Sequence, residues 1–145
     1  MTRLLVAEPN AVLNRGIQQI CEHLVRVDVC RDFHGARQQL LKERPDALVT
    51  NLRLDSYNGL HLVLLVKAAN RAARCIVHTD RPDAYLTREG QALGAFFERT
   101  ERLSQALAGY LRAALPEHDR RDLARYDRRA GARGGRRATD LPAPA

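Results

Sequence analysis

Polar side chains that could do chemistry stand at the carboxyl ends of short apolar segments in this sequence. Glu8, Asn51 and Thr79 each hold such a position. In a parallel sheet with right-handed crossovers, the carboxyl ends of the first, third and fourth strands meet at one edge. A carboxylate, an amide and a hydroxyl are therefore expected to lie close together there.

This set lacks the groups that covalent transfer or metal catalysis needs. The amide nitrogen of Asn51 is not nucleophilic, and its oxygen carries no full negative charge. Hard divalent cations usually bind more than one carboxylate, or a carboxylate with a substrate phosphate. Glu8 is the only carboxylate of this set, which makes the set a poor site for such a cation, and we expect no cofactor. No nucleophile–base pair, phosphate loop or metal cluster indicates an enzyme.

The histidines and cysteines show no ligand spacing. The histidines are His23, His34, His61, His78 and His118, and we expect surface or hydrogen-bonded core positions for them. His78, beside Thr79, could face either layer of the fold. Three cysteines, an odd number, argue against a disulfide framework.

Short apolar segments alternate with helical patterns along the chain, which is typical of a parallel α/β sheet. The predicted strands are Arg3–Ala7, Val25–Cys30, Ala47–Thr50, Cys75–Thr79 and Ala95–Phe97. The second alternates apolar and charged residues and is predicted at an edge, whereas the third is nearly continuously apolar and is predicted at the centre. Five such strand–helix units predict a flavodoxin-like (βα)5 doubly wound parallel sheet.

The helix ends have their own signals. Asn10, Asp32 and Thr100 are predicted N-caps of the first, second and fifth helices. Pro82 is expected near the first turn of the fourth helix, and Gly94 is expected to end it.

The charge and composition divide the chain at about residue 115. Residues 1–115 hold 16 Lys+Arg and 12 Asp+Glu, a net +4, and we assign them to one domain. Residues 116–145 hold 8 Arg and 5 acids, a net +3, and form a basic Arg/Gly/Pro-rich tail. The tail has few apolar residues to bury, so we predict that it is mostly disordered.

The tail leaves several interpretations open. Its arginines could attract nucleic acid, an acidic protein or an anionic membrane surface. Its interleaved acids, and Tyr126 as its only aromatic residue, fit a solvated segment equally well. The apolar runs are far shorter than the roughly 20 residues of a membrane span, and the segment after Met1 is too short for a secretory signal. We therefore expect a cytoplasmic protein with no membrane partner.

Over about residues 3–115 the sequence resembles the receiver domains of two-component response regulators. The resemblance lies in Leu5–Asn10, Pro45–Leu54, Asn58–Leu60, Ile76–Asp80 and Gly94–Thr100. It implies a site where acids hold Mg²⁺, an aspartate accepts a phosphoryl group, and a hydroxyl and a lysine contact the phosphoryl oxygens. The positions that match this site are Glu8, Pro9, Asn51, Thr79 and Arg99.

The matched positions depart from the family pattern at three places. Pro9 replaces the second acid, Asn51 replaces the phosphoacceptor, and Arg99 replaces the lysine. The resemblance therefore implies a degenerate pseudo-receiver, in which phosphotransfer fails at both the nucleophile and the metal. Glu8 is the only remaining candidate ligand, so we expect weak or absent Mg²⁺ binding. Asn51 could be held by Arg99 or Thr79, or could simply be a polar residue at the start of a loop. Glu8 and Arg99 could form an ion pair that fills the pocket, or an ordinary exposed pair. A permanently neutralised pocket could lock one conformation.

An atypical acceptor is the alternative. Asp55 or Asp80 could accept a phosphoryl group, or both could be solvated loop acids. The resemblance also implies an output face that contains Phe96, Phe97 and Tyr110, with one Phe ring in the core and the other partly exposed.

The favoured hypothesis is a stand-alone, phosphorylation-independent signalling module. Its expected partner is a histidine kinase or a downstream regulator, and a homodimer is a further possibility. The alternatives are an active phosphorelay receiver with an atypical acceptor, and a nucleic-acid-associated protein that binds through its tail.

Overall fold

The computed structural model describes residues 2–112, and the predicted tail, residues 116–145, lies outside them. The strands are β1 (Arg3–Ala7), β2 (Arg26–Cys30), β3 (Ala47–Asn51), β4 (Arg53–Leu54), β5 (Tyr57–Asn58), β6 (Arg74–Thr79) and β7 (Ala95–Arg99). The helices are α1 (Ala11–Cys21), α2 (Phe33–Lys42), α3 (Leu60–Ala69), α4 (Ala84–Ala92) and α5 (Leu103–Arg112), with a 3-10 turn, η1 (Thr100–Arg102), before α5.

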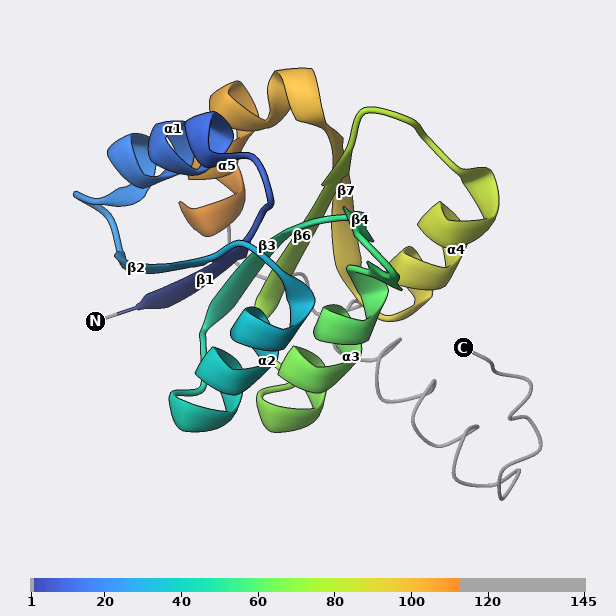
Figure 1. The fold of residues 1–145 in the computed structure, drawn as a ribbon, viewed down its shortest axis with the longest axis horizontal. Coiled ribbons are helices and arrows are strands. Elements are labelled where there is room, and N and C mark those ends of the chain that lie inside the picture. Colours follow the sequence, from blue (N-terminus) through green and yellow to red (C-terminus); the bar gives the residue numbers. More distant parts are fainter. Residues whose placement is uncertain (1, 113–145) are drawn as a thin grey trace.

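Five strands form one parallel sheet in the order β2-β1-β3-β6-β7. This order confirms the flavodoxin-like doubly wound prediction. It also confirms that the second strand lies at an edge and that β3 lies at the centre. The carboxyl ends of β1, β3 and β6 are consequently neighbours at one edge of the sheet (Figure 1).

Two apolar cores lie on opposite faces of the sheet. On one face, Leu4, Val6 and Ile76 of the sheet pack with residues of α1 and α5. On the other face, Leu5 and Val77 pack with residues of α2 and α3. Figure 1 shows α1 and α5 together on one side and α2 and α3 side by side on the other. The period-two alternation of each strand therefore decides which helices a side chain meets.

The first two helix caps follow the sequence prediction. Asn10 Oδ1 accepts hydrogen bonds from the N–H groups of Val12 and Leu13. Asp32 Oδ1 accepts one from the N–H of Gly35, at 2.7 Å.

The ends of the later elements differ in detail. The fourth helix begins at Ala84, because the carboxylate of Asp83 accepts a hydrogen bond from the N–H of Leu86 and caps the helix. Pro82 lies just before this cap, near the first turn as expected. Gly94, with a φ of 89°, follows the helix as predicted.

The prediction that Thr100 is the N-cap of the fifth helix is wrong. It is the first residue of η1, and its hydroxyl caps no backbone N–H because it bonds to His78 instead. The fifth strand also continues two residues beyond the predicted Ala95–Phe97, to Arg99.

A short antiparallel hairpin, absent from the sequence prediction, follows β3. Arg53–Leu54 pairs with Tyr57–Asn58, and Asp55 in its turn has a φ of 55°. Aspartate tolerates this left-handed conformation better than most residues. Within residues 2–112, no helix has the length and apolar character needed to cross a membrane.

Candidate functional site at the strand ends

Glu8, Asn51 and His78 come together on the α1/α5 face of the sheet. Asn51 and His78 are register partners on β3 and β6, and Glu8 follows the residue of β1 that pairs with Thr50. Each lies two residues beyond an apolar residue of the α1/α5 core, and alternation keeps it on that face. The sequence predicted a polar cluster of Glu8, Asn51 and Thr79 at the strand ends. In the structure the third member of the cluster is His78, to which the sequence assigned no role.

Glu8 is almost fully buried, and protein groups use both of its carboxylate oxygens. Oε1 accepts a hydrogen bond from the amide of Asn51, at 3.0 Å, and lies 2.9 Å from Nε2 of His78. Oε2 accepts one from the backbone N–H of Asn10, at 2.8 Å. The relative exposure of Glu8 is 2%, and that of His78 is 0%. A buried carboxylate needs such partners because a bare charge in the interior is costly.

These contacts decide the charge state of Glu8. Burial alone would raise its pKa, since it penalises the carboxylate. The contact with His78, the N–H of Asn10, the charge of His78 and the amide of Asn51 together outweigh burial. The pKa of Glu8 is therefore held below its ordinary value of 4.5, and the side chain is ionised at neutral pH.

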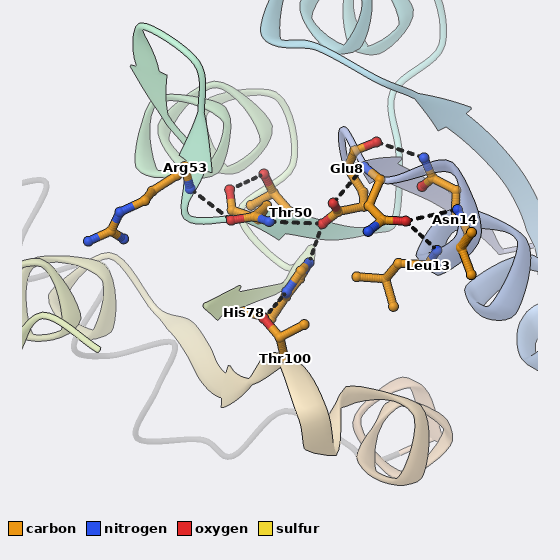
Figure 2. A network of polar contacts seen from close by, with 10 residues as sticks. Glu8, Leu13, Asn14, Thr50, Arg53, His78 and Thr100 are labelled. Carbon is orange, nitrogen blue, oxygen red and sulfur yellow. Dashed lines mark hydrogen bonds and ion pairs between the residues drawn. The ribbon is translucent and has the colours of Figure 1, made fainter. Parts of the chain in front are cut away.

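His78 connects Glu8 to Thr100. Its Nδ1 lies 2.9 Å from Oγ1 of Thr100, and Figure 2 shows the contacts running from Glu8 through His78 to Thr100. Because a carboxylate can only accept, Nε2 carries the hydrogen that faces Glu8. The N–H is not well aligned with that oxygen, so the attraction is chiefly electrostatic. We call Asn51, Glu8, His78 and Thr100 the polar relay.

Asn51 is fixed at both ends of its amide. Its nitrogen donates to Glu8, and its Oδ1 accepts from the backbone N–H of Arg53, at 2.9 Å. Neither of the holders expected from the sequence, Arg99 or Thr79, contacts the side chain of Asn51 in the described part of the chain.

Thr79 and Arg99 belong to the opposite side of the sheet. Thr79 follows the alternation of Val77, which lies in the α2/α3 core. Its hydroxyl donates to the carbonyl of Arg81 and accepts from the N–H of Arg81, each at 3.1 Å. The guanidinium of Arg53 approaches the same oxygen at 3.5 Å.

Arg99 does not pair with Glu8, as one interpretation of the sequence expected. Its guanidinium lies 3.3 Å from the carboxylate of Glu101, with about half of the side chain exposed. The positive charge beside Thr79 comes from Arg53 instead.

The remaining predicted positions lie at the surface or provide backbone only. Pro9 has no side-chain ligand, and its carbonyl accepts a hydrogen bond from Arg31, at 3.1 Å. Asp55, in the hairpin turn, and Asp80, after β6, are both exposed.

The residues of this site do not fit the Mg²⁺ ion of the receiver pattern. Both oxygens of Glu8 and the oxygen of Asn51 already accept hydrogen bonds, and Pro9 offers no carboxylate. Among residues 2–112, no group of three or more His, Cys, Asp or Glu side chains could hold a metal ion.

Asn14 of α1 lies beside Glu8, and one of its side-chain atoms has no hydrogen-bond partner. Its amide nitrogen donates to the carbonyl of Glu8 at 2.6 Å, and its Oδ1 is buried without a hydrogen-bond partner. Buried orphan oxygens of this kind commonly accept from an ordered water molecule.

The predicted output residues divide between the two faces. Phe96 stacks on Tyr110 of α5, with ring centroids 5.3 Å apart, and the hydroxyl of Tyr110 donates to Glu98 at 2.9 Å. Phe97 packs against the α2/α3 core. Both rings are partly buried, so one partly exposed ring is found as expected, whereas the second ring is not fully in the core.

Sequence reasoning missed His78 and Thr100 as partners. A usable signal was present, because His78 is the one titratable side chain within Ile76–Thr79 and lies two residues after the buried Ile76. Alternation then places His78 and Thr79 on opposite faces.

No protein-family model matches the sequence, and neither does any curated protein. Solved structures, by contrast, match its fold. The chemotaxis response regulator CheY4 of Vibrio cholerae is 17% identical, with a TM-score of 0.63 over 76% of this chain and 98% of that chain. A two-component response regulator of the LuxR family from Aurantimonas sp. SI85-9A1 is 19% identical, with a TM-score of 0.63 over 88% and 99% of the two chains.

The BeF3-activated receiver domain of DrrB is also similar, at 18% identity and a TM-score of 0.63 over 78% of this chain and 99% of that chain. At such identities the likeness concerns the fold alone, and the described residues have the fold of response regulator receiver domains.

Proposed function

We propose that this protein is a phosphorylation-independent signalling module of the two-component type. It would be a pseudo-receiver that acts in the cytoplasm through non-covalent binding to a histidine kinase or a downstream regulator. The observation that carries the proposal is the full use of the Glu8 carboxylate by Asn10, Asn51 and His78. Three protein groups face the roughly four lone-pair sites of this carboxylate, which leaves it little capacity for a metal ion or a phosphoryl donor.

The chemistry at Asn51 supports the same proposal. Phosphoryl transfer to a receiver needs an oxygen nucleophile and a metal that neutralises the developing charge. Asn51 offers an amide, and its oxygen already accepts from Arg53. No side chain at residue 51 therefore supplies the oxygen nucleophile or a carboxylate ligand for the metal.

The polar relay does not support an enzymatic role, although its carboxylate, imidazole and hydroxyl follow the order of a nucleophilic triad. His78 has no exposed surface, so a substrate cannot reach the imidazole without rearrangement. We therefore propose that the protein is not an enzyme and that the relay is structural.

The test is an amide NMR titration with Mg²⁺ and beryllofluoride, which mimics a phosphoryl group on aspartate. We expect no saturable shifts at Asn51, Thr79 or Arg53. Saturable shifts there would overturn the proposal.

Incubation with acetyl phosphate, followed by mass mapping, tests the alternative acceptors directly. We expect no adduct, whereas an adduct at Asp55 or Asp80 would favour an active phosphorelay receiver. A well-characterised receiver with an intact aspartate serves as the positive control for both reagents.

A further inference from the structure

The polar relay crosses three strands of the sheet and ends at a helix. It begins at Asn51 on β3, passes through Glu8 at the end of β1 and His78 on β6, and reaches Thr100. Thr100 begins η1, and its carbonyl accepts the N–H of Leu103, the first residue of α5. One continuous set of contacts therefore joins the candidate site to the start of α5.

Neighbouring members of the relay are linked through common groups, so a change in the contacts of one side chain alters the contacts of the next. Oε1 of Glu8 serves both Asn51 and His78. If Asn51 stops donating, His78 becomes the only side chain that satisfies this oxygen. The ring is buried, and its other nitrogen is tied to Thr100, so a shift of the ring towards Glu8 must change the contact with Thr100.

On the opposite face of the sheet, Asn51 reaches Thr79 only through Arg53, whose backbone N–H bonds to Asn51 and whose guanidinium lies 3.5 Å from the hydroxyl of Thr79. The hydroxyl of Thr79 is engaged by the backbone of Arg81. Phe97 is packed directly against α4: a Cβ atom added at Gly90 would lie 2.7 Å from Cζ of the ring. Helix backbone this close to the ring leaves it little room to rotate.

We infer that the polar relay couples the Asn51 site to the first turn of α5, on the α1/α5 face of the sheet. This coupling deepens the function proposed above, because it names the element that would respond when a partner binds at the site. The responding element is η1 with α5, and the side of the sheet that carries Thr79 and Phe97 stays fixed.

A double-mutant cycle tests the coupling. Asn51→Ala and Thr100→Val remove the two ends of the relay, which make no hydrogen bond to each other. The unfolding constants of unlinked sites combine additively in free energy to within about twofold, and linked sites deviate by more than this. We expect the unfolding constant of the double variant to differ about fivefold from the product of the single effects, which is about 1 kcal/mol.

The matched control is the same cycle with Thr87→Val in place of Thr100→Val. Thr87, on α4, also donates its hydroxyl to a backbone carbonyl, that of Asp83, at 2.8 Å. It has no link to the relay, so we expect additivity within about twofold. Equal deviations in the two cycles, or additivity in both, would overturn the inference.

A second measurement avoids any dependence on unfolding. In the Asn51→Ala protein, we expect the amide NMR signals of Glu101, Arg102 and Leu103 to shift more than those of Ala84 to Thr87. In a Glu8→Gln/His78→Leu background, where the relay is broken, Asn51→Ala should no longer shift them. Persistence of those shifts in the broken background would refute the coupling.

These experiments use unphosphorylated protein without beryllofluoride. A failed cycle therefore counts against the coupling alone, and a saturable beryllofluoride response counts against phosphorylation independence alone.

Discussion

Replacing His78 isolates the electrostatics of Glu8. His78→Leu removes the imidazole and keeps a buried apolar side chain, while the donors from Asn10 and Asn51 remain. Removing one partner of a buried pair typically costs about 3–5 kcal/mol, a large part of the ~5–15 kcal/mol stability of a domain. We expect a loss of this size at pH 7.

The pH dependence of the variant gives a sharper result. In the wild type, the pKa of Glu8 lies below its ordinary value. Its ionisation therefore stabilises the fold fully above pH 4.5, and this stability is lost as the pH falls through the folded-state pKa. Without His78, two of the effects that lower the pKa disappear and the burial effect that raises it stays. The pKa of Glu8 then rises, and the folded variant gains stability relative to the unfolded chain as the pH falls.

Comparison with Glu8→Gln/His78→Leu separates this effect from all others, since neither variant contains His78. At pH 7 the double variant should be more stable than His78→Leu by about 1–3 kcal/mol, because it carries no unpaired buried charge. The difference should narrow as the pH falls and Glu8 takes up a proton. Each unit of upward pKa shift contributes about 1.4 kcal/mol to it.

Urea denaturation followed by circular dichroism, at several pH values between 4 and 7, measures this difference. A difference that stays constant over the range would refute the assignment of Glu8 as the ion that His78 compensates. So would a single variant that is more stable than the double variant at pH 7.

Three further predictions follow from other contacts. Asn51→Asp should lower the free energy of unfolding by about 1–3 kcal/mol at pH 7, because it puts a second carboxylate where the amide nitrogen now lies 3.0 Å from Glu8. The loss should shrink towards pH 4 as one carboxyl takes up a proton. Equal stability of variant and wild type at pH 7 in urea denaturation would contradict this prediction. Gly90→Ala should lower the melting temperature by an amount equivalent to about 1–3 kcal/mol, because the new methyl group would overlap the ring of Phe97. The control Gly109→Ala, with open space around the new methyl group, should be neutral or stabilising. Similar melting temperatures for the two variants would count against the packing of Phe97 on Gly90. Burial raises the thiol pKa of Cys21 to about 11 and that of Cys75 to about 12. Both should therefore resist iodoacetamide at pH 8 in the folded protein, while the partly buried Cys30 reacts first. Prompt alkylation of Cys75, detected by mass mapping, would show that its strand opens readily.

The sequence predicts the sheet well because buried strands and their polar ends have distinct compositions. Ala47–Thr50 is nearly continuously apolar, and β3 lies at the centre, while the alternating segment before Cys30 lies at the edge. These features are local, and the strand order follows from the crossover rule.

The partners within the site could not be predicted in the same way. The pairing of Glu8 with His78 joins residues that are 70 positions apart, and it depends on which face each strand end presents. Arg99 illustrates the difficulty: β7 continues to residue 99, so alternation places Glu98 on the α1/α5 face with Tyr110 and turns Arg99 away from Glu8. Thr100 resembles an N-cap in the sequence, and its actual partner, Nδ1 of His78, is invisible in the local sequence.

The sharing of Glu8 among several donors also has an evolutionary consequence. Under the proposed function, no single favourable substitution converts this chain into a phosphorylatable receiver. Asn51→Asp alone adds a carboxylate beside one that His78 already holds, and it supplies no second metal ligand at Pro9. Changes at residues 9, 51 and 78 would each be unfavourable or neutral until the others are present. Under the proposed function, phosphotransfer would therefore require several of these substitutions together.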